Sequence, residues 1–190
     1  MLRIWELTTD PNHYLFVQTV DLRYFSDRFD GTPIADQWEV PAHEVLNRSK
    51  KVADFTSWQI GSKAFLVSDL ARECIAQLDE GAVEFLPFGK IKGRELFAAN
   101  VLRTEDFLDI HKTEFSEGSG LPVRVAWRPG LPNVLPPIFK VKGSSDTYVS
   151  ADFGRMAVEH GLTGLMLADP AKNRLQQIVR GGPINEFPGL

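Results

Sequence analysis

The sequence predicts an α+β fold, in which a mixed, largely antiparallel twisted sheet carries a few packed helices. Three observations indicate this class. Short strand-like segments alternate with turn residues along most of the chain. Only two segments show helical periodicity, and each lies inside a strand–helix–strand unit. With 190 residues, of which 43% are hydrophobic, the chain has the size and apolar content of a single domain with a sizeable core.

Residues 1–60 predict an irregular, strand-rich part of that domain. Strands are expected at four places, which are residues 1–7, 15–20, 38–40 and 53–58. A turn is expected over residues 27–34, because Gly31 permits a positive φ and Pro33 restricts the residue before it. Residues 47–51 form a basic cluster, which we interpret as a solvated loop because no glycine-rich entrance to a helix follows it.

The first strand–helix–strand unit opens the central part of the chain, residues 61–169. An apolar strand over residues 65–67 leads to Ser68, whose hydroxyl is placed to cap a helix. Apolar residues then recur at helical spacing and predict one buried face, made of Leu70, Cys74, Ile75 and Leu78. Gly81 suits the left-handed position that ends a helix. Two further strands are expected over residues 83–88 and 96–102, joined by a loop over residues 89–93.

The second unit repeats this pattern after a short strand at residues 138–141. Its first strand ends in Ser150, which we expect to cap a second helix, and His160 and Gly161 are suited to the end of that helix. Thirteen positions separate Ser68 from Gly81, but only eleven separate Ser150 from Gly161. This mismatch argues against a strict tandem repeat and leaves an internal duplication open.

The remaining segments predict a hairpin, a crossover and a tail. Residues 110–115 and 123–127 are expected to pair across a Gly-rich turn. The proline-rich stretch 128–137 is expected to be an irregular crossover, because prolines lack an amide donor. The tail, residues 170–190, is rich in helix and strand breakers, and we expect it to be mobile or to lie over the surface.

Charge and composition restrict the partners that we expect. The formal net charge is −4 and the isoelectric point is about 5.6, which disfavours nonspecific binding to nucleic acid. The sequence has neither an apolar run of membrane-spanning length nor a secretory signal, so we expect a cytoplasmic protein without a membrane partner. A single cysteine, Cys74, excludes an intramolecular disulfide, and we interpret it as a buried helix residue.

No motif in the sequence predicts catalytic, metal-binding or cofactor-binding residues. The four histidines are far apart and lack metal-ligand spacing. Ser68 and Ser150 lack the flanking glycines of a nucleophile elbow. Two carboxylate pairs could act as acid and base, Asp36 with Glu39 and Asp106 with Asp109. Such pairs are common on any solvated surface.

Several short segments of this chain occur in the same order as similar segments of a known protein family. They are Val67-Ser68 with its helix, Glu84-Phe85-Leu86-Pro87, residues 97–101, residues 106–109, Pro137-Ile138-Phe139-Lys140, Tyr148-Val149-Ser150, Phe153 and residues 161–165. Over about residues 60–169 the chain resembles the Myxococcus-type immunity domain of bacterial polymorphic toxin systems, a family once described only as a domain of unknown function. The tail beyond Pro170 has no counterpart in this pattern. The resemblance implies a protein without catalytic residues that neutralises a cognate toxin by binding it.

The residues that we expect to face this partner are Trp38 and an acidic stretch, Glu105, Asp106, Asp109, Glu114 and Glu117. Negative charge there would steer a basic toxin toward the protein, and tryptophan is enriched at binding hot spots. Two alternatives stay open. One is a small-ligand-binding protein or enzyme with a pocket between the two strand–helix–strand units, and the other is an adaptor that dimerises through an exposed strand.

Overall fold

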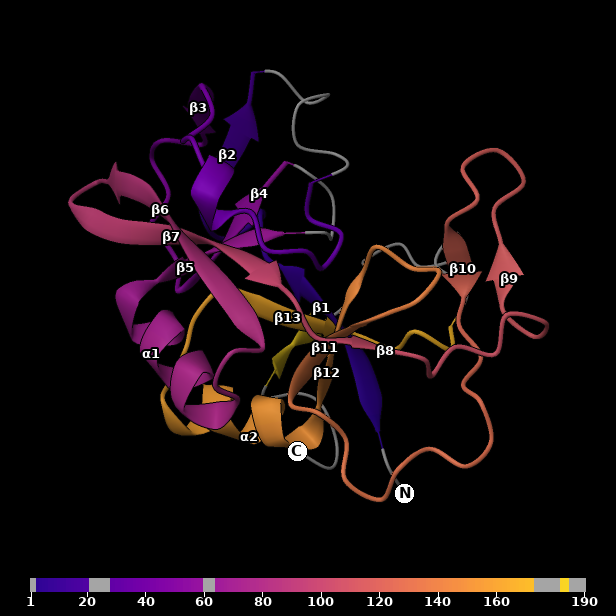
Figure 1. Cartoon of the computed structure of the whole chain (residues 1–190). Coiled ribbons are helices and arrows are strands. Elements are labelled where there is room, and N and C mark those ends of the chain that lie inside the picture. The colour runs from indigo at the N-terminus through magenta and orange to yellow at the C-terminus, as the bar shows by residue number, and fades with distance from the viewer. Residues whose placement is uncertain (1–2, 21–27, 60–63, 173–181, 185–190) are drawn as a thin grey trace.

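The computed structural model describes residues 3–20, 28–59, 64–172 and 182–184 (Figure 1). It confirms the α+β class, with two helices and sheets that are largely antiparallel. Most of the strands are divided between two six-stranded sheets, and two more form a separate two-stranded sheet, whereas a single sheet was expected. The tail that was expected to be mobile lies mostly outside the described residues.

The first sheet, sheet 1, is built from both ends of the described chain. Its strand order is β14 (Gly182–Pro183), β13 (Leu165–Ala168), β1 (Ile4–Thr9), β12 (Thr147–Ser150), β11 (Ile138–Val141) and β8 (Thr104–Glu105). All neighbours are antiparallel except β11 and β8. Strand β1 lies between β12 and β13, so the beginning of the chain completes a sheet that the C-terminal part forms.

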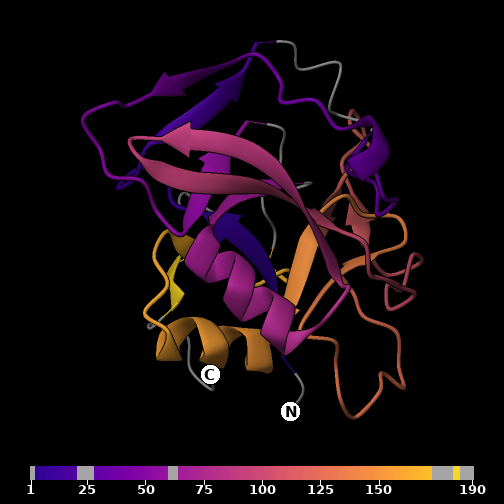
Figure 2. The ribbon, with the colours of Figure 1, turned by 60° about the vertical axis from the view of Figure 1, so that its left-hand side comes forward.

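The second sheet, sheet 2, curls into a half-barrel (Figure 2). Its strand order is β3 (His43–Leu46), β2 (Phe16–Thr19), β4 (Phe55–Trp58), β5 (Phe65–Ser68), β7 (Arg94–Val101) and β6 (Val83–Ile91). The curl brings the two outermost strands together, so that the ring centres of His43 in β3 and Phe88 in β6 are only 4.6 Å apart. Its concave face encloses an apolar cluster around Phe29, Trp58 and Leu66.

The two strand–helix–strand units have the same topology. In sheet 2 the spatial order is β4-β5-β7-β6, and in sheet 1 it is β11-β12-β1-β13, with every neighbouring pair antiparallel. Each helix therefore connects two parallel strands across one intervening strand. The intervening strand follows its unit in sheet 2, but it comes from the N-terminal end of the chain in sheet 1.

Helices α1 (Asp69–Leu78) and α2 (Ala151–Glu159) pack against each other below the sheets (Figure 2). Both contribute to the apolar core that lies between the sheets, through residues such as Ile75 and Phe153. The structure confirms the expected cap of α1, where Ser68 accepts a hydrogen bond from the Ala71 amide. Ser150 occupies the expected N-cap position of α2, but its hydroxyl makes no capping hydrogen bond.

Three further expectations need correction. Leu70 does not join the buried face of α1, because it lies in the first turn of the helix and is 45% exposed. Residues 38–40 form no strand, since the chain makes a short 3-10 helix at Ala35–Gln37 just before them. The loop expected over residues 89–93 is shorter, because β6 extends to Ile91. The hairpin is confirmed, with short strands β9 (Glu114–Phe115) and β10 (Pro122–Arg124).

Candidate functional site

The β9–β10 hairpin stands out from the side of both sheets (Figure 1). We call residues 106–128 the arm. Its base packs on the face of sheet 1 that points away from the helices, because Phe139 and Tyr148 face the arm while their neighbours Ile138 and Val149 face the core. Trp127 lies edge-on to Tyr148, with 5.2 Å between the ring centres. The arm is therefore anchored by buried aromatic contacts.

The acidic stretch lies on the arm and at its base, but most of its charge is paired locally. The ion pairs are Glu105 with Arg103 at 3.0 Å, Asp106 with Arg128 at 2.7 Å, Asp109 with Lys112 at 3.4 Å and Glu114 with Arg124 at 2.7 Å. Within the described part of the chain, Glu117 is the one member of the stretch without an ion pair. Residues 103–128 contain five carboxylates and four lysines or arginines, so their formal charge is −1.

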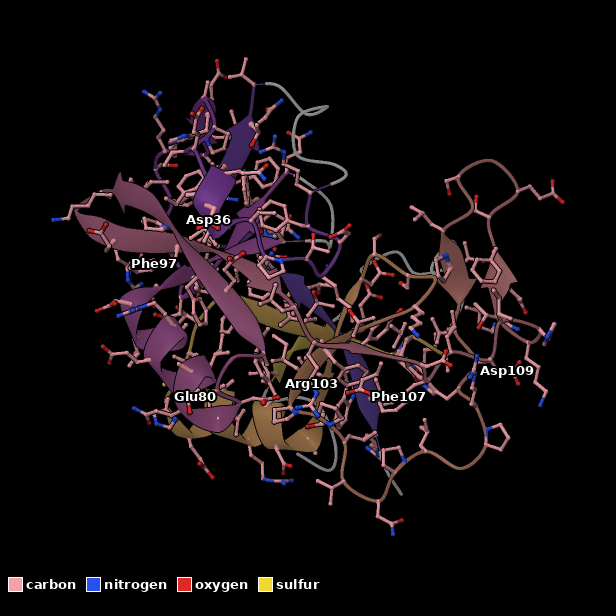
Figure 3. All side chains as sticks on the ribbon, viewed as in Figure 1. Asp36, Glu80, Phe97, Arg103, Phe107 and Asp109 are labelled. Carbon is pink, nitrogen blue, oxygen red and sulfur yellow. The ribbon has the colours of Figure 1, made fainter. Side chains whose placement is uncertain are left out.

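A larger acidic excess lies on the helices. Residues 69–80 contain four carboxylates and one arginine, and residues 151–160 contain two carboxylates and one arginine. Figure 3 shows Glu80 at the end of α1 and Asp109 on the arm, far apart on the molecule. Long-range attraction of a basic partner would therefore act mainly toward the helices, and the arm would contribute shape and short-range contacts.

Trp38 lies away from the arm, over sheet 2. Figure 3 shows Asp36, two residues before it, above the sheet and distant from Asp109. The indole Nε1 of Trp38 donates a hydrogen bond to the Pro87 carbonyl at 2.7 Å, and its ring lies edge-on to Trp58 with 6.4 Å between the centres. The side chain is half-buried and helps to close the half-barrel. The fold does not bring it together with the acidic stretch.

A buried carboxylate that the sequence analysis did not single out connects the two strand–helix–strand units. Asp54 is 4% exposed and accepts hydrogen bonds from the hydroxyls of Ser68 at 2.7 Å and Thr163 at 2.6 Å. The Arg94 guanidinium approaches it at 2.5 Å. Burial acts to raise the pKa of Asp54, but the hydrogen bonds from Thr163 and Ser68 and the charge of Arg94 together hold it below its usual value.

This network determines what Ser68 can do. Its hydroxyl donates its proton to Asp54 and accepts from the Ala71 amide, so both its hydrogen-bonding roles are taken by the fold. A nucleophilic serine needs an exposed hydroxyl oxygen and a neighbouring base that takes up its proton. Ser68 is only 1% exposed, and its neighbour Asp54 is held ionised by Arg94. The geometry favours a structural role for this serine.

The space between the two units contains packed side chains. The core cluster includes Phe55 and Phe65 from sheet 2 together with Phe153 from α2, and the rings of Phe55 and Phe153 are 6.1 Å apart. Among the described residues, no group of three or more histidine, cysteine or carboxylate side chains is arranged to hold a metal ion. In the same part of the chain, neither helix has the length and apolarity needed to cross a bilayer.

No family model and no curated protein matches this chain.

Proposed function

We propose that this protein is an immunity-type protein that binds a cognate bacterial toxin and neutralises it by occlusion, without catalysis. The observation that carries the proposal is the arm, a projecting hairpin with an anchored base and an exposed tip (Figure 1). The ordered segments that resemble the immunity family support the same function.

The tip of the arm is suited to enter a concave surface. Its turn is closed by hydrogen bonds from the Ser116 amide to the Leu121 carbonyl and from the Gly120 amide to the Ser116 carbonyl, both at 2.9 Å. A loop that is already ordered loses little conformational entropy when it binds. Leu121 is 47% exposed beside this turn, and Glu117 is exposed within it. Leu121 thus offers apolar surface that binding would bury, and Glu117 offers a charge that a basic partner would pair.

Co-expression with the toxin encoded by the adjacent gene tests the proposal. We expect the wild-type protein to restore growth and to co-purify with the toxin. Leu121→Asp should abolish the complex, because it places a charge in the apolar contact. Val20→Asp is the matched control, since Val20 is 64% exposed and directly follows β2, a strand that Figure 1 shows away from the arm. Absence of both rescue and complex with the wild type would overturn the function, whereas a complex that survives Leu121→Asp would exclude the arm as its contact.

A further inference from the structure

Two basic segments that are distant in sequence meet at the tip of the β6–β7 hairpin. The Nζ of Lys92 donates to the Lys50 carbonyl at 2.7 Å, and the Nη1 of Arg94 donates to the Val52 carbonyl at 3.0 Å. The six cations of these segments, which we call the basic edge, are Arg48, Lys50, Lys51, Lys90, Lys92 and Arg94. Figure 1 shows this hairpin tip on the opposite side of the molecule from the arm.

Only two of these six cations are neutralised by a carboxylate among the described residues. Arg94 pairs with Asp54 at 2.5 Å, and Lys90 approaches Glu95 at 3.8 Å. The ammonium group of Lys50 donates instead to the carbonyls of Pro11 and Asn12, at 3.1 and 2.5 Å. Carbonyl oxygens hold a lysine in place without cancelling its charge. The basic edge is therefore ordered and remains positive.

The ammonium groups at the basic edge have N–H donors left for a ligand. An ammonium group has three N–H donors; Lys50 uses two of them and Lys92 uses one. Lys51 and Arg48 are exposed beside them. Unneutralised like charges held close together repel one another, and an anion that bridges them removes this repulsion. Ammonium groups bind phosphate oxygens through short, charge-assisted hydrogen bonds.

We infer that the basic edge binds the phosphate groups of a compact ligand. The net charge of the whole chain is −4, so the rest of the surface repels a long polyanion while the basic edge attracts a small one. A free polyphosphate group and a short stretch of single-stranded nucleic-acid backbone both supply this chemistry. The inference is independent of toxin binding, because it concerns a different face of the molecule.

Two probes distinguish these sources, inorganic tripolyphosphate in calorimetry and a short fluorescent thymidine oligonucleotide in anisotropy. We expect saturable binding of at least one probe. For single-stranded nucleic acid, the logarithm of the binding constant falls with the logarithm of the salt concentration, with a slope of about −0.7 per phosphate contacted. If each of the four cations without a carboxylate partner contacts one phosphate, oligonucleotide binding should be about 50-fold weaker at 200 than at 50 mM salt. Binding of tripolyphosphate alone identifies a free polyphosphate ligand, and binding of the oligonucleotide identifies single-stranded nucleic-acid backbone.

Charge-reversal variants locate the site. Lys51→Glu combined with Lys92→Glu should weaken binding at least about tenfold and lower the salt slope of oligonucleotide binding by about 0.7 for each lysine contact removed. Lys112→Glu combined with Lys142→Glu changes the net charge equally on exposed residues elsewhere and should bind like the wild type. Arg48→Glu with Lys51→Glu gives a second test if the first variant does not fold. Failure of both probes to bind, or equal binding by the basic-edge and control variants, would overturn the inference.

Discussion

Thr163 donates its hydroxyl to the carboxylate of Asp54 at 2.6 Å, across 109 positions of sequence. In return, the Asp54 amide donates to the Thr163 hydroxyl at 3.1 Å. Asp54 also accepts from Ser68, at the start of the first helix, whereas Thr163 precedes the last strand of the second unit. One buried carboxylate thus joins the two units where sheet 2 meets the end of α2. Its ionisation should control how tightly they are held together.

Replacing Asp54 with Asn should destabilise the protein most near neutral pH. The substitution leaves Arg94 without its anion and removes a charge that accepts from two hydroxyls, so we expect a loss of about 3 kcal/mol. Because the folded pKa of Asp54 is lowered, its ionised form adds stability above the unfolded pKa of about 3.9. That stability disappears as pH falls through the lower folded pKa.

Urea denaturation of wild type and Asp54→Asn at several pH values measures this effect. The difference between the two proteins should be largest near pH 7 and should shrink below about pH 4. The pKa of Asp30 is also lowered, chiefly by hydrogen bonds from Thr32, but Asp30 is present in both proteins and its contribution cancels. A difference that stays constant over this range would contradict the assigned ionisation of Asp54.

The two helix-capping serines should respond differently to alanine. Ser68→Ala removes the bond to the Ala71 amide and a bond to Asp54, so it should cost about 2 kcal/mol. Ser150→Ala removes a buried hydroxyl that has no partner among the described residues, so its effect should lie within about 0.5 kcal/mol of zero. Chemical denaturation of both variants gives the comparison, and equal losses would refute the difference between the caps.

Local patterns in the sequence predicted the individual units well. The periodicity of Cys74 and Ile75 identified the buried face of α1, and Gly81 adopts the expected positive φ of 79°. The division into two sheets could not be read in this way. It depends on β1 pairing between β12 and β13, and no local pattern shows which distant strand a segment will join.

The same limit applies to the candidate sites. The cations near the acidic stretch were visible in the sequence, but only the folded arm shows that Arg128 reaches Asp106 and that Arg124 reaches Glu114. Asp54 looked like an ordinary residue at the beginning of a strand, because its partners lie as many as 109 positions away. A carboxylate flanked by apolar residues, such as Ala53 and Phe55, is the one local sign that could have drawn attention to it.

Gly164 and Gly161 should differ strongly in their tolerance of alanine, although both have a positive φ. A Cβ at Gly164 would lie 2.3 Å from the Phe55 carbonyl oxygen and 2.4 Å from the Cβ of Ala53, at the start of β4 and just before it. A Cβ at Gly161 meets nothing within 4 Å. We therefore expect Gly161→Ala to cost about 1–2 kcal/mol, from backbone strain alone.

Gly164→Ala should cost more than about 3 kcal/mol or prevent folding, because backbone must move to accommodate it. Thermal denaturation of the two variants measures the difference. Similar melting temperatures would show that the turn can shift away from Phe55, and that the contact between the two units is looser than these distances require.

Cys74 should be unreactive in the folded protein. Burial raises the pKa of its thiol, and the negative charges of Glu73 and Asp54 raise it further. The side chain is 6% exposed and packs in the core between the two helices and the sheets, so a thiol reagent reaches it only when α1 opens. We expect labelling by a chromogenic disulfide at pH 8 to be about a thousandfold or more slower than in urea. Labelling at the rate of the unfolded chain would mean that α1 separates readily from the core, and it would reopen the question of a reactive cysteine.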